Sequence, residues 1–161
     1  MSHRPFLRWP NPRLSATAEP VEIVDGPVLA IWEEMLEAMY AMPGVGLAAP
    51  QIGVMRRLAV VDAGNGPIRL ADPVVLHASV EIRSHDEGSP NLPGVTAKVT
   101  RPRAVRIGYL DEAGIRRERD FVMLEATSVQ HQIDHLDGRM FFDRLSKLRR
   151  DMLLRKARKC V

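Results

Sequence analysis

Two histidines four residues apart are the part of this sequence best suited to chemistry. His131 and His135 lie in the stretch VQHQIDHLDG. Residues at i and i+4 lie on one face of a helix, so both imidazoles can turn a nitrogen toward a common ion. Asp134 is a candidate to hold one imidazole in the required tautomer, and Gly138 to end the helix. Helices of this kind usually carry a catalytic glutamate, but Gln132 stands in its place. The spacing predicts a metal site, with two neighbouring histidines that bind nothing as the open alternative.

Two further stretches place polar groups among glycines and prolines. Residues 44–53, GVGLAAPQIG, contain glycines that allow a ligand to approach the backbone closely. Gln51 in this stretch offers its amide either to a ligand or to buried backbone groups. Residues 85–95, HDEGSPNLPGV, have the prolines and glycines of a turn-rich loop. These stretches supply polar groups from which a site around the histidines could be built.

The elements that must position these groups follow from the hydrophobic periodicity. Apolar residues at helical spacing predict a first helix over residues 27–42, with an aspartate and a proline as start signals and Pro43 as part of the stop. Further helices are predicted over 125–137, around the histidines, and over 144–159. The histidines therefore lie on the second of three predicted helices.

Between the first two helices the pattern changes to short β-rich runs separated by turn clusters such as AGNGP and DEAG. These runs predict meandering, mostly antiparallel strands. They read LAVVD, PIRLADPVVL, ASVEIRSH, TAKVT, AVRIGYL and RERDFVML. A helix, a block of strands and two more helices indicate an α+β fold. At 161 residues the chain has the length of one domain, residues 1–161.

The composition is that of a soluble globular protein. Hydrophobic residues make up 45% of the chain and charged residues 27%, which excludes a disordered or fibrous class. No apolar run approaches the ~20 residues that span a bilayer. The first residues lack the apolar stretch of a secretory signal, so a cytoplasmic protein with no membrane partner is expected. The single cysteine, Cys160, has no partner for an internal disulfide and is expected to be exposed.

The charge is distributed unevenly. Residues 144–161 contain eight basic residues and one acid, and the rest of the chain carries a net charge of about −4. Leu145, Leu148 and Met152 lie at helical spacing, with Leu153 and Leu154 beside them, so a C-terminal helix can bury one face and display its basic side chains on the other. Such a basic face either is merely solvated or binds an acidic partner.

Taken in order, the three stretches resemble the signatures of the peptide deformylase family, which removes the N-terminal formyl group from nascent polypeptides. The family motifs run Gly-x-Gly-Leu-Ala-Ala-x-Gln, Glu-Gly-Cys-Leu-Ser and Gln-His-Glu-x-Asp-His. The resemblance extends from LRWPNPRL to FFDRL and implies mostly antiparallel strands packed around a central histidine-bearing helix, with an N-terminal and a C-terminal helix. It also implies an ion pair between Glu87 and Arg101. The residues that it assigns to substrate binding are Gly44, Val45, Gly46, Glu87, Asn91 and Leu92.

The residues that depart from the family motifs are those that do the chemistry. Ser89 replaces a cysteine that binds the metal, and a hydroxyl gives up its proton to a metal far less readily than a thiol. Gln132 replaces the glutamate that shuttles the proton, and an amide cannot do so. Pro90 follows the ligand position and lacks the N–H that would hold the oxyanion beside Gln51. The implied metal ligands are thus His131, His135 and Ser89, and the implied catalytic positions are Gln51 and Gln132.

Two readings of function follow from these substitutions. In the first, a monomeric peptide deformylase-like protein has lost most or all deformylation and binds peptide N-termini, nascent chains or, through its basic helix, the ribosome. Iron, zinc or nickel is then bound weakly or not at all. In the second, a metal-dependent amide hydrolase has rebuilt its site, with His85 or Asp86 as the replacement ligand, although both are otherwise polar residues of an exposed strand end. Thr127 and Ser128 are expected to line the substrate pocket with hydroxyls in either case.

Overall fold

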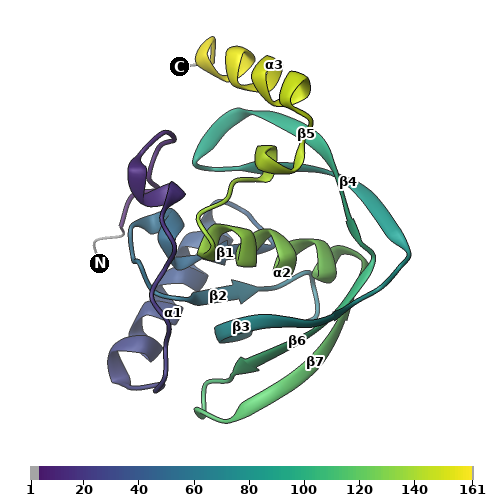
Figure 1. Cartoon of the computed structure of the whole chain (residues 1–161). Coiled ribbons are helices and arrows are strands. Elements are labelled where there is room, and N and C mark those ends of the chain that lie inside the picture. The colour runs from purple at the N-terminus through teal and green to yellow at the C-terminus, as the bar shows by residue number, and fades with distance from the viewer. Residues whose placement is uncertain (1–3, 161) are drawn as a thin grey trace.

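The chain folds as the α+β protein that its pattern predicts, with strands wrapped around one central helix (Figure 1). The computed structural model describes residues 4–160. The helices are α1 (Gly26–Ala41), α2 (Met123–Leu136) and α3 (Lys147–Arg158), with short 3-10 helices η1 (Pro12–Ser15), η2 (Ala49–Ile52) and η3 (Phe141–Arg144). The strands are β1 (Gly46–Ala48), β2 (Leu58–Val61), β3 (Ile68–Ala78), β4 (Ile82–Ser89), β5 (Leu92–Pro102), β6 (Ala104–Leu110) and β7 (Arg116–Val122). One sheet has the order β1-β2-β3-β6-β7 and the other pairs β4 with β5, and all these pairs are antiparallel.

Local signals determine where α1 begins and ends. The Asp25 side chain accepts a hydrogen bond from the backbone N–H of Val28 at 3.1 Å. Pro27 occupies the first turn, where a missing N–H leaves no helical bond unmade. The helix ends at Ala41, two residues before Pro43. The predicted helix is confirmed to within one residue at each end.

The five-stranded sheet separates α1 from α2. Leu58 and Val60 pack with residues of α1, whereas Ala59 and Val61 pack with residues of α2 on the opposite face. All of β2 is therefore buried, because both faces of this strand are covered. Ten of the fourteen residues of α2 are buried. Packing on several sides thus gives the side chains of α2 defined positions.

Residues 85–95 form a β-hairpin and not the predicted loop. β4 continues to Ser89 and β5 begins at Leu92, so only two residues lie between the strands. The prediction failed because the buried residues at this end of β4, Glu87 and Ser89, are polar. Their alternation with exposed neighbours is regular, but no apolar pattern reveals it.

The starts of the last two helices differ from the prediction. α2 begins at Met123, so the end of the run RERDFVML belongs to this helix and not to β7. α3 begins at Lys147 and not at residue 144, because the Ser146 side chain caps it by accepting a hydrogen bond from a first-turn N–H at 3.3 Å. Residues 141–144 form η3, which buries two phenylalanines.

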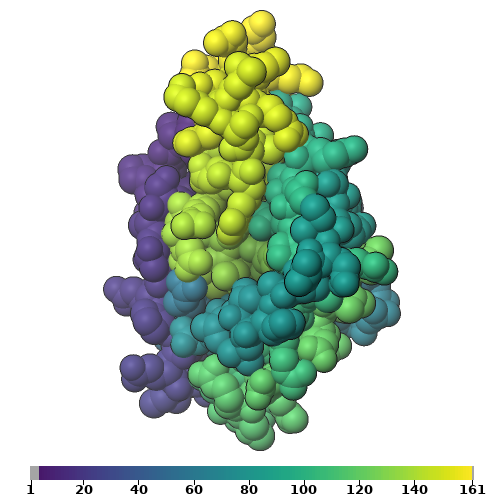
Figure 2. All heavy atoms as spheres, turned by 45° about the vertical axis from the view of Figure 1, so that its right-hand side comes forward, coloured from purple at the N-terminus to yellow at the C-terminus, as the bar shows by residue number. Residues whose placement is uncertain are grey.

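α3 lies on the second sheet and forms one end of the molecule (Figure 2). Leu153, Leu154 and Ala157 are buried beside residues of β5 and η3. The helix buries one face, as predicted, but Leu153 and Leu154 form that face, whereas Leu148 and Met152 are 70% and 58% exposed. The basic side chains of α3 are exposed.

Two further expectations concern the ends of the chain and the membrane. Cys160 is an exposed free thiol, as expected. Residues 1–3 and Val161, which belong to the predicted domain and basic helix, lie outside the described residues. Within residues 4–160, no helix has both the length and the apolar character needed to cross a membrane.

Candidate functional site

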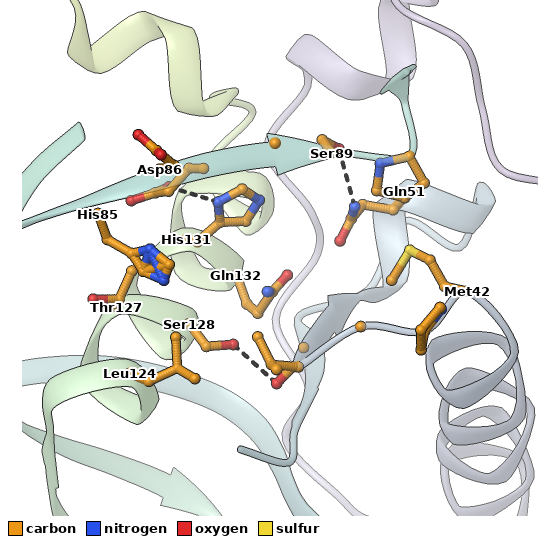
Figure 3. A pocket seen from close by; sticks show the side chains of 17 residues that line it. Met42, Gln51, His85, Asp86, Ser89, Leu124, Thr127, Ser128, His131 and Gln132 are labelled. Carbon is orange, nitrogen blue, oxygen red and sulfur yellow. Dashed lines mark hydrogen bonds and ion pairs between the residues drawn. The ribbon is translucent and has the colours of Figure 1, made fainter. Parts of the chain in front are cut away.

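A cavity of about 330 Å³ lies between α2, the segment that leads into β1 and the end of β4 (Figure 3). Its apolar lining includes Met42, Val45 and Leu124. Gly46 allows α2 to approach this segment, since a Cβ there would lie 2.3 Å from the Ser128 hydroxyl and 2.5 Å from the amide nitrogen of Gln132. The polar side chains that line it are Gln51, His85, Asp86, Glu87, Ser89, Thr127, Ser128, His131 and Gln132.

The imidazoles of His131 and His135 face each other inside the protein. Their Nε2 atoms lie 3.1 Å apart, and Nδ1 of His131 lies 2.8 Å from a carboxylate oxygen of Glu87. When His131 donates its Nδ1 hydrogen to Glu87 and carries none on Nε2, it accepts at Nε2 the hydrogen of His135. Nδ1 of His135 is buried and has no hydrogen-bond partner among residues 4–160. Burial is the main cause that holds the pKa of His135 well below its ordinary value of 6.5, and the positive charge of Arg101 lowers it further, so this ring is neutral at neutral pH.

Two buried carboxylates, the buried Arg101 and the more exposed Arg144 form a network beside the histidine pair. Arg101 donates to Glu87 at 2.7 and 2.9 Å and to Asp134 at 2.8 Å, which confirms the expected ion pair with Glu87. Burial alone would raise the pKa of Glu87, but hydrogen bonds from His131 and Arg101 outweigh it and lower the pKa to about 2. Asp134 is bound by Arg101 and Arg144. The prediction that Asp134 holds an imidazole is therefore wrong, because Glu87 does so from β4.

Ser89 belongs to a hydrogen-bond network of its own. Its hydroxyl donates to Oδ1 of Asn91 at 3.0 Å and accepts from the backbone N–H of Asn91 at 3.3 Å. Nε2 of Gln51 donates to the same Oδ1 at 2.8 Å and to the Ser89 hydroxyl at a longer 3.4 Å. Pro90 continues the cavity lining after Ser89 and offers no N–H there.

Gln132 extends from α2 into the space between Ser128 and Gln51 (Figure 3). It is 4% exposed, and its Oε1 has no hydrogen-bond partner in the described part of the chain. An amide can donate and accept hydrogen bonds, but it cannot carry a proton between two groups at neutral pH. The residue that follows the first histidine is thus polar and buried without being a base.

Most of the predicted site residues share one cavity. His135 lies behind His131, with 1% of its surface exposed. Two residues expected to bind substrate do not line the cavity: Asn91 is 1% exposed, and Leu92 packs in the core beside η3 and α3. The predicted residues that line it are Gly44, Val45, Gly46, Gln51, Glu87, Ser89, His131 and Gln132.

Thr127 and Ser128 line the cavity as expected, but their hydroxyls already have partners. Arg83 donates to Oγ1 of Thr127 at 2.9 Å, and Ser128 donates to the carbonyl oxygen of Val45 at 3.1 Å. The second bond ties α2 to the segment that leads into β1. Both hydroxyls therefore support the wall as well as making it polar.

The groups around the two histidines do not fit a resident divalent ion. Within residues 4–160, no three His, Cys, Asp or Glu side chains are placed to hold a metal together. His85 and Asp86 line the cavity but do not complete such a set. If both imidazoles offered Nε2 lone pairs, His135 would carry its hydrogen on Nδ1, for which no partner lies among the described residues.

Helix α2 with its paired histidines, the glutamine-bearing η2 and the end of β4 form the sides of the candidate site. Residues 3–151 match the model of the polypeptide deformylase family. Peptide deformylase of Methylocella silvestris is 44% identical over 169 residues, which cover 100% of this chain and 86% of that protein. Peptide deformylase of Rhizobium meliloti is 39% identical over 166 residues, which cover 100% and 95%.

Solved structures agree with the sequence relatives. Peptide deformylase of Ehrlichia chaffeensis in complex with actinonin has a TM-score of 0.93 at 33% identity, covering 99% of this chain and 98% of that one. The enzyme of Legionella pneumophila has a TM-score of 0.90 at 37% identity, covering 98% and 95%. The chain belongs to the peptide deformylase family.

Three contributors to the site were not predicted from the sequence. Met42 and Leu124 supply apolar lining, and Arg144 binds the buried carboxylate of Asp134. Met42 and Leu124 lie just outside the stretches that resemble the family motifs, and no sequence pattern indicates that either side chain faces the cavity. Arg144 was assigned to a basic helix, although its position directly after two phenylalanines and an aspartate sets it apart from that helix.

Proposed function

We propose that this member of the peptide deformylase family has lost efficient deformylation of N-formylmethionyl peptides and acts as a binding protein. The observation that carries the proposal is the chemistry of Ser89. A hydroxyl that already donates to Asn91 and accepts from Gln51 stands where a metal-binding thiolate would be needed. Two imidazoles without a third ionisable ligand hold a divalent ion poorly.

Two further substitutions act on the reaction itself. Without a general base at Gln132, the rate is expected to fall by ~10²–10⁴. Without the N–H that Pro90 lacks, one oxyanion donor is missing, which is worth ~10²–10³ in kcat. The losses do not simply multiply, because such groups act as a unit. Even the smaller one alone leaves about a hundredth of the activity.

The test is deformylation of a short formyl-methionyl peptide by the full chain, supplied with excess ferrous or nickel ion without oxygen. His135→Ala is the matched control, because it removes one imidazole and shares any contaminating host enzyme. Equal turnover by the two proteins is the expected result. Turnover by the natural chain that disappears in His135→Ala would overturn the proposal.

That second outcome is the one expected of a metal-dependent amide hydrolase with a rebuilt site. The observation in favour of this alternative is the 3.1 Å approach of the two Nε2 atoms, together with Gln51 on the opposite wall. Substitution of His85 then shows whether a rebuilt site uses this residue as its replacement metal ligand. A rebuilt site that uses this residue loses metal affinity in His85→Ala, measured by titration calorimetry with nickel.

Peptide N-termini are the ligand class that the cavity suits. Its volume of about 330 Å³ lies at the lower end of the range of ligand pockets, and its lining combines apolar residues with polar ones. Val45, 40% exposed at the cavity, is the residue to test. Val45→Glu is expected to abolish binding of a fluorescent formyl-methionyl peptide in an anisotropy titration. Val80→Glu is the control, since Val80 is 96% exposed away from the cavity lining; equal binding by both variants would exclude this site.

We also propose that the basic side chains of α3 bring the protein to ribosomes in the cytoplasm. Deleting the helix is a poor test, because Leu153 and Leu154 are part of the core. Neutralising exposed residues avoids that problem. Co-sedimentation with ribosomes should fall when Arg155, Lys156 and Arg158 become glutamine, and the natural interaction should weaken steeply with salt. Three glutamines at the exposed arginines Arg116, Arg117 and Arg119 form the control, and an equal fall there would contradict a specific role of α3.

A further inference from the structure

We infer that Asn91 is a positioning residue that holds the Gln51 side chain in a closed network and withholds its amide from a bound ligand. The inference rests on the proposed loss of deformylation and extends it to a residue that does not line the cavity. It predicts that repairing the three substitutions at the reaction centre does not by itself restore efficient turnover.

All the hydrogen-bonding capacity of the Asn91 side chain is used inside the protein. Nδ2 donates to the carbonyl oxygens of Leu7 at 2.6 Å and Gln51 at 3.0 Å. Oδ1 accepts from Nε2 of Gln51 at 2.8 Å and from the hydroxyl of Ser89 at 3.0 Å. A side-chain amide has two donor hydrogens and two acceptor lone pairs, so none is left over. Asn91 thus connects the N-terminal segment, η2 and the hairpin in a site that is 1% exposed.

The Gln51 side chain is held at both of its atoms. Oε1 accepts the backbone N–H of Ala48 at 2.9 Å, so the orientation of the amide is defined. Nε2 then directs its shorter bond, 2.8 Å, at Asn91 and its longer one, 3.4 Å, at Ser89. The hydrogen that binds Asn91 can reach a ligand in the cavity only if the shorter bond breaks and leaves a buried carbonyl short of a partner, so only the hydrogen in the longer bond to Ser89 is readily offered to a ligand. Buried polar groups resist that exchange.

A shorter side chain at position 91 would break this arrangement. Serine is the residue that the family motif places here, and its hydroxyl has neither the amide oxygen that accepts from Gln51 nor the NH₂ group that bridges Leu7 and Gln51. In Asn91→Ser the Nε2 hydrogen of Gln51 that binds Asn91 is expected to be released toward the cavity. The expected gain is one oxyanion donor, which is typically worth ~10²–10³ in kcat.

The kinetic experiment starts from the full chain with Ser89→Cys, Pro90→Leu and Gln132→Glu, loaded with nickel. Adding Asn91→Ser is expected to raise kcat on a formyl-methionyl peptide by about 10²-fold or more, with KM and nickel affinity unchanged. Asn65→Ser in the same background is the matched control, because Asn65 lies in an exposed loop. Values of kcat within about threefold of each other for the two additions would overturn the inference.

A second measurement needs no turnover and uses the natural sequence. The side-chain amide protons of Gln51, followed by nitrogen-15 NMR, should exchange with water slowly in the natural chain. They should exchange at least ~10-fold faster in Asn91→Ser than in Asn65→Ser. Exchange in the natural chain as fast as that of a solvated glutamine would overturn the inference even if the variant fails to fold. Because the proposed loss of activity is tested by turnover of the natural chain, failure of one idea does not imply failure of the other.

Discussion

Removing Arg101 is expected to destabilise the protein far more than removing an exposed arginine with the same number of partners. The guanidinium of Arg101 binds Glu87 through two nitrogens and Asp134 through the third. The three side chains are 4%, 5% and 6% exposed, so solvent screens their charges very little. Arg101→Met keeps most of the buried length of the side chain and removes only the charge and the donors.

The magnitude follows from what remains after the substitution. Breaking a buried ion pair by removing one partner costs ~3–5 kcal/mol, because the other charge stays buried without compensation. Here two carboxylates lose a partner, but Glu87 keeps His131 and Asp134 keeps Arg144. The remaining partners reduce the loss for each carboxylate, so the free energy of unfolding should fall by roughly 3 kcal/mol.

Urea denaturation followed by circular dichroism measures this loss, with Arg106→Met as the control. Arg106 also binds two carboxylates, those of Glu118 and Asp120, at 3.1 and 3.2 Å, but its side chain is 45% exposed. Water and salt screen exposed ion pairs, so the control should lose little stability. Equal losses in the two variants would refute the reasoning that burial, and not the number of ion pairs, determines the contribution.

Three other predictions concern acid, backbone strain and metal. The pKa of Glu87 is about 2 in the folded protein and near 4.5 when unfolded, so the stabilisation by its carboxylate is complete above about pH 4.5 and is lost as the pH falls toward 2. The difference in unfolding free energy between the natural chain and Glu87→Gln, roughly 3 kcal/mol from the pKa shift, should therefore shrink over that range. A difference that stays constant with pH would contradict this prediction. Gly138→Ala should lower the free energy of unfolding, measured in urea, more than Gly66→Ala does. Both glycines have positive φ, +77° and +97°, but only at Gly138 would the added Cβ meet another group, the carbonyl oxygen of Ser15 at 2.7 Å. Backbone strain alone costs ~1–3 kcal/mol in each variant, so equal losses would mean that the contact with Ser15 relaxes freely. Dialysis against a chelator should move Tm by less than about 2 °C, because a metal ion raises Tm only when the folded protein binds it tightly. A large fall in Tm would reveal a resident ion.

The sequence alone determined the bounds of α1, the presence of two further helices and the histidine face of α2. Helical periodicity, the Asp25 cap and Pro43 located α1, and the i, i+4 spacing put two imidazoles side by side because that geometry is local to one helix. The family motifs also identified Ser89 and Gln132 as the decisive substitutions, since each changes the chemistry of a side chain whatever surrounds it. These inferences needed no long-range contact.

The tertiary structure decided which polar groups meet. Glu87 and not Asp134 holds His131, although 44 residues separate them, because β4 crosses α2 at that point. Asn91, which the resemblance assigned to substrate binding, joins segments 84 and 40 residues away in one buried network. Hydrogen bonds between distant strands, turns and helices depend on how the layers pack, and a linear pattern of apolar residues carries no information about which polar side chains those layers enclose.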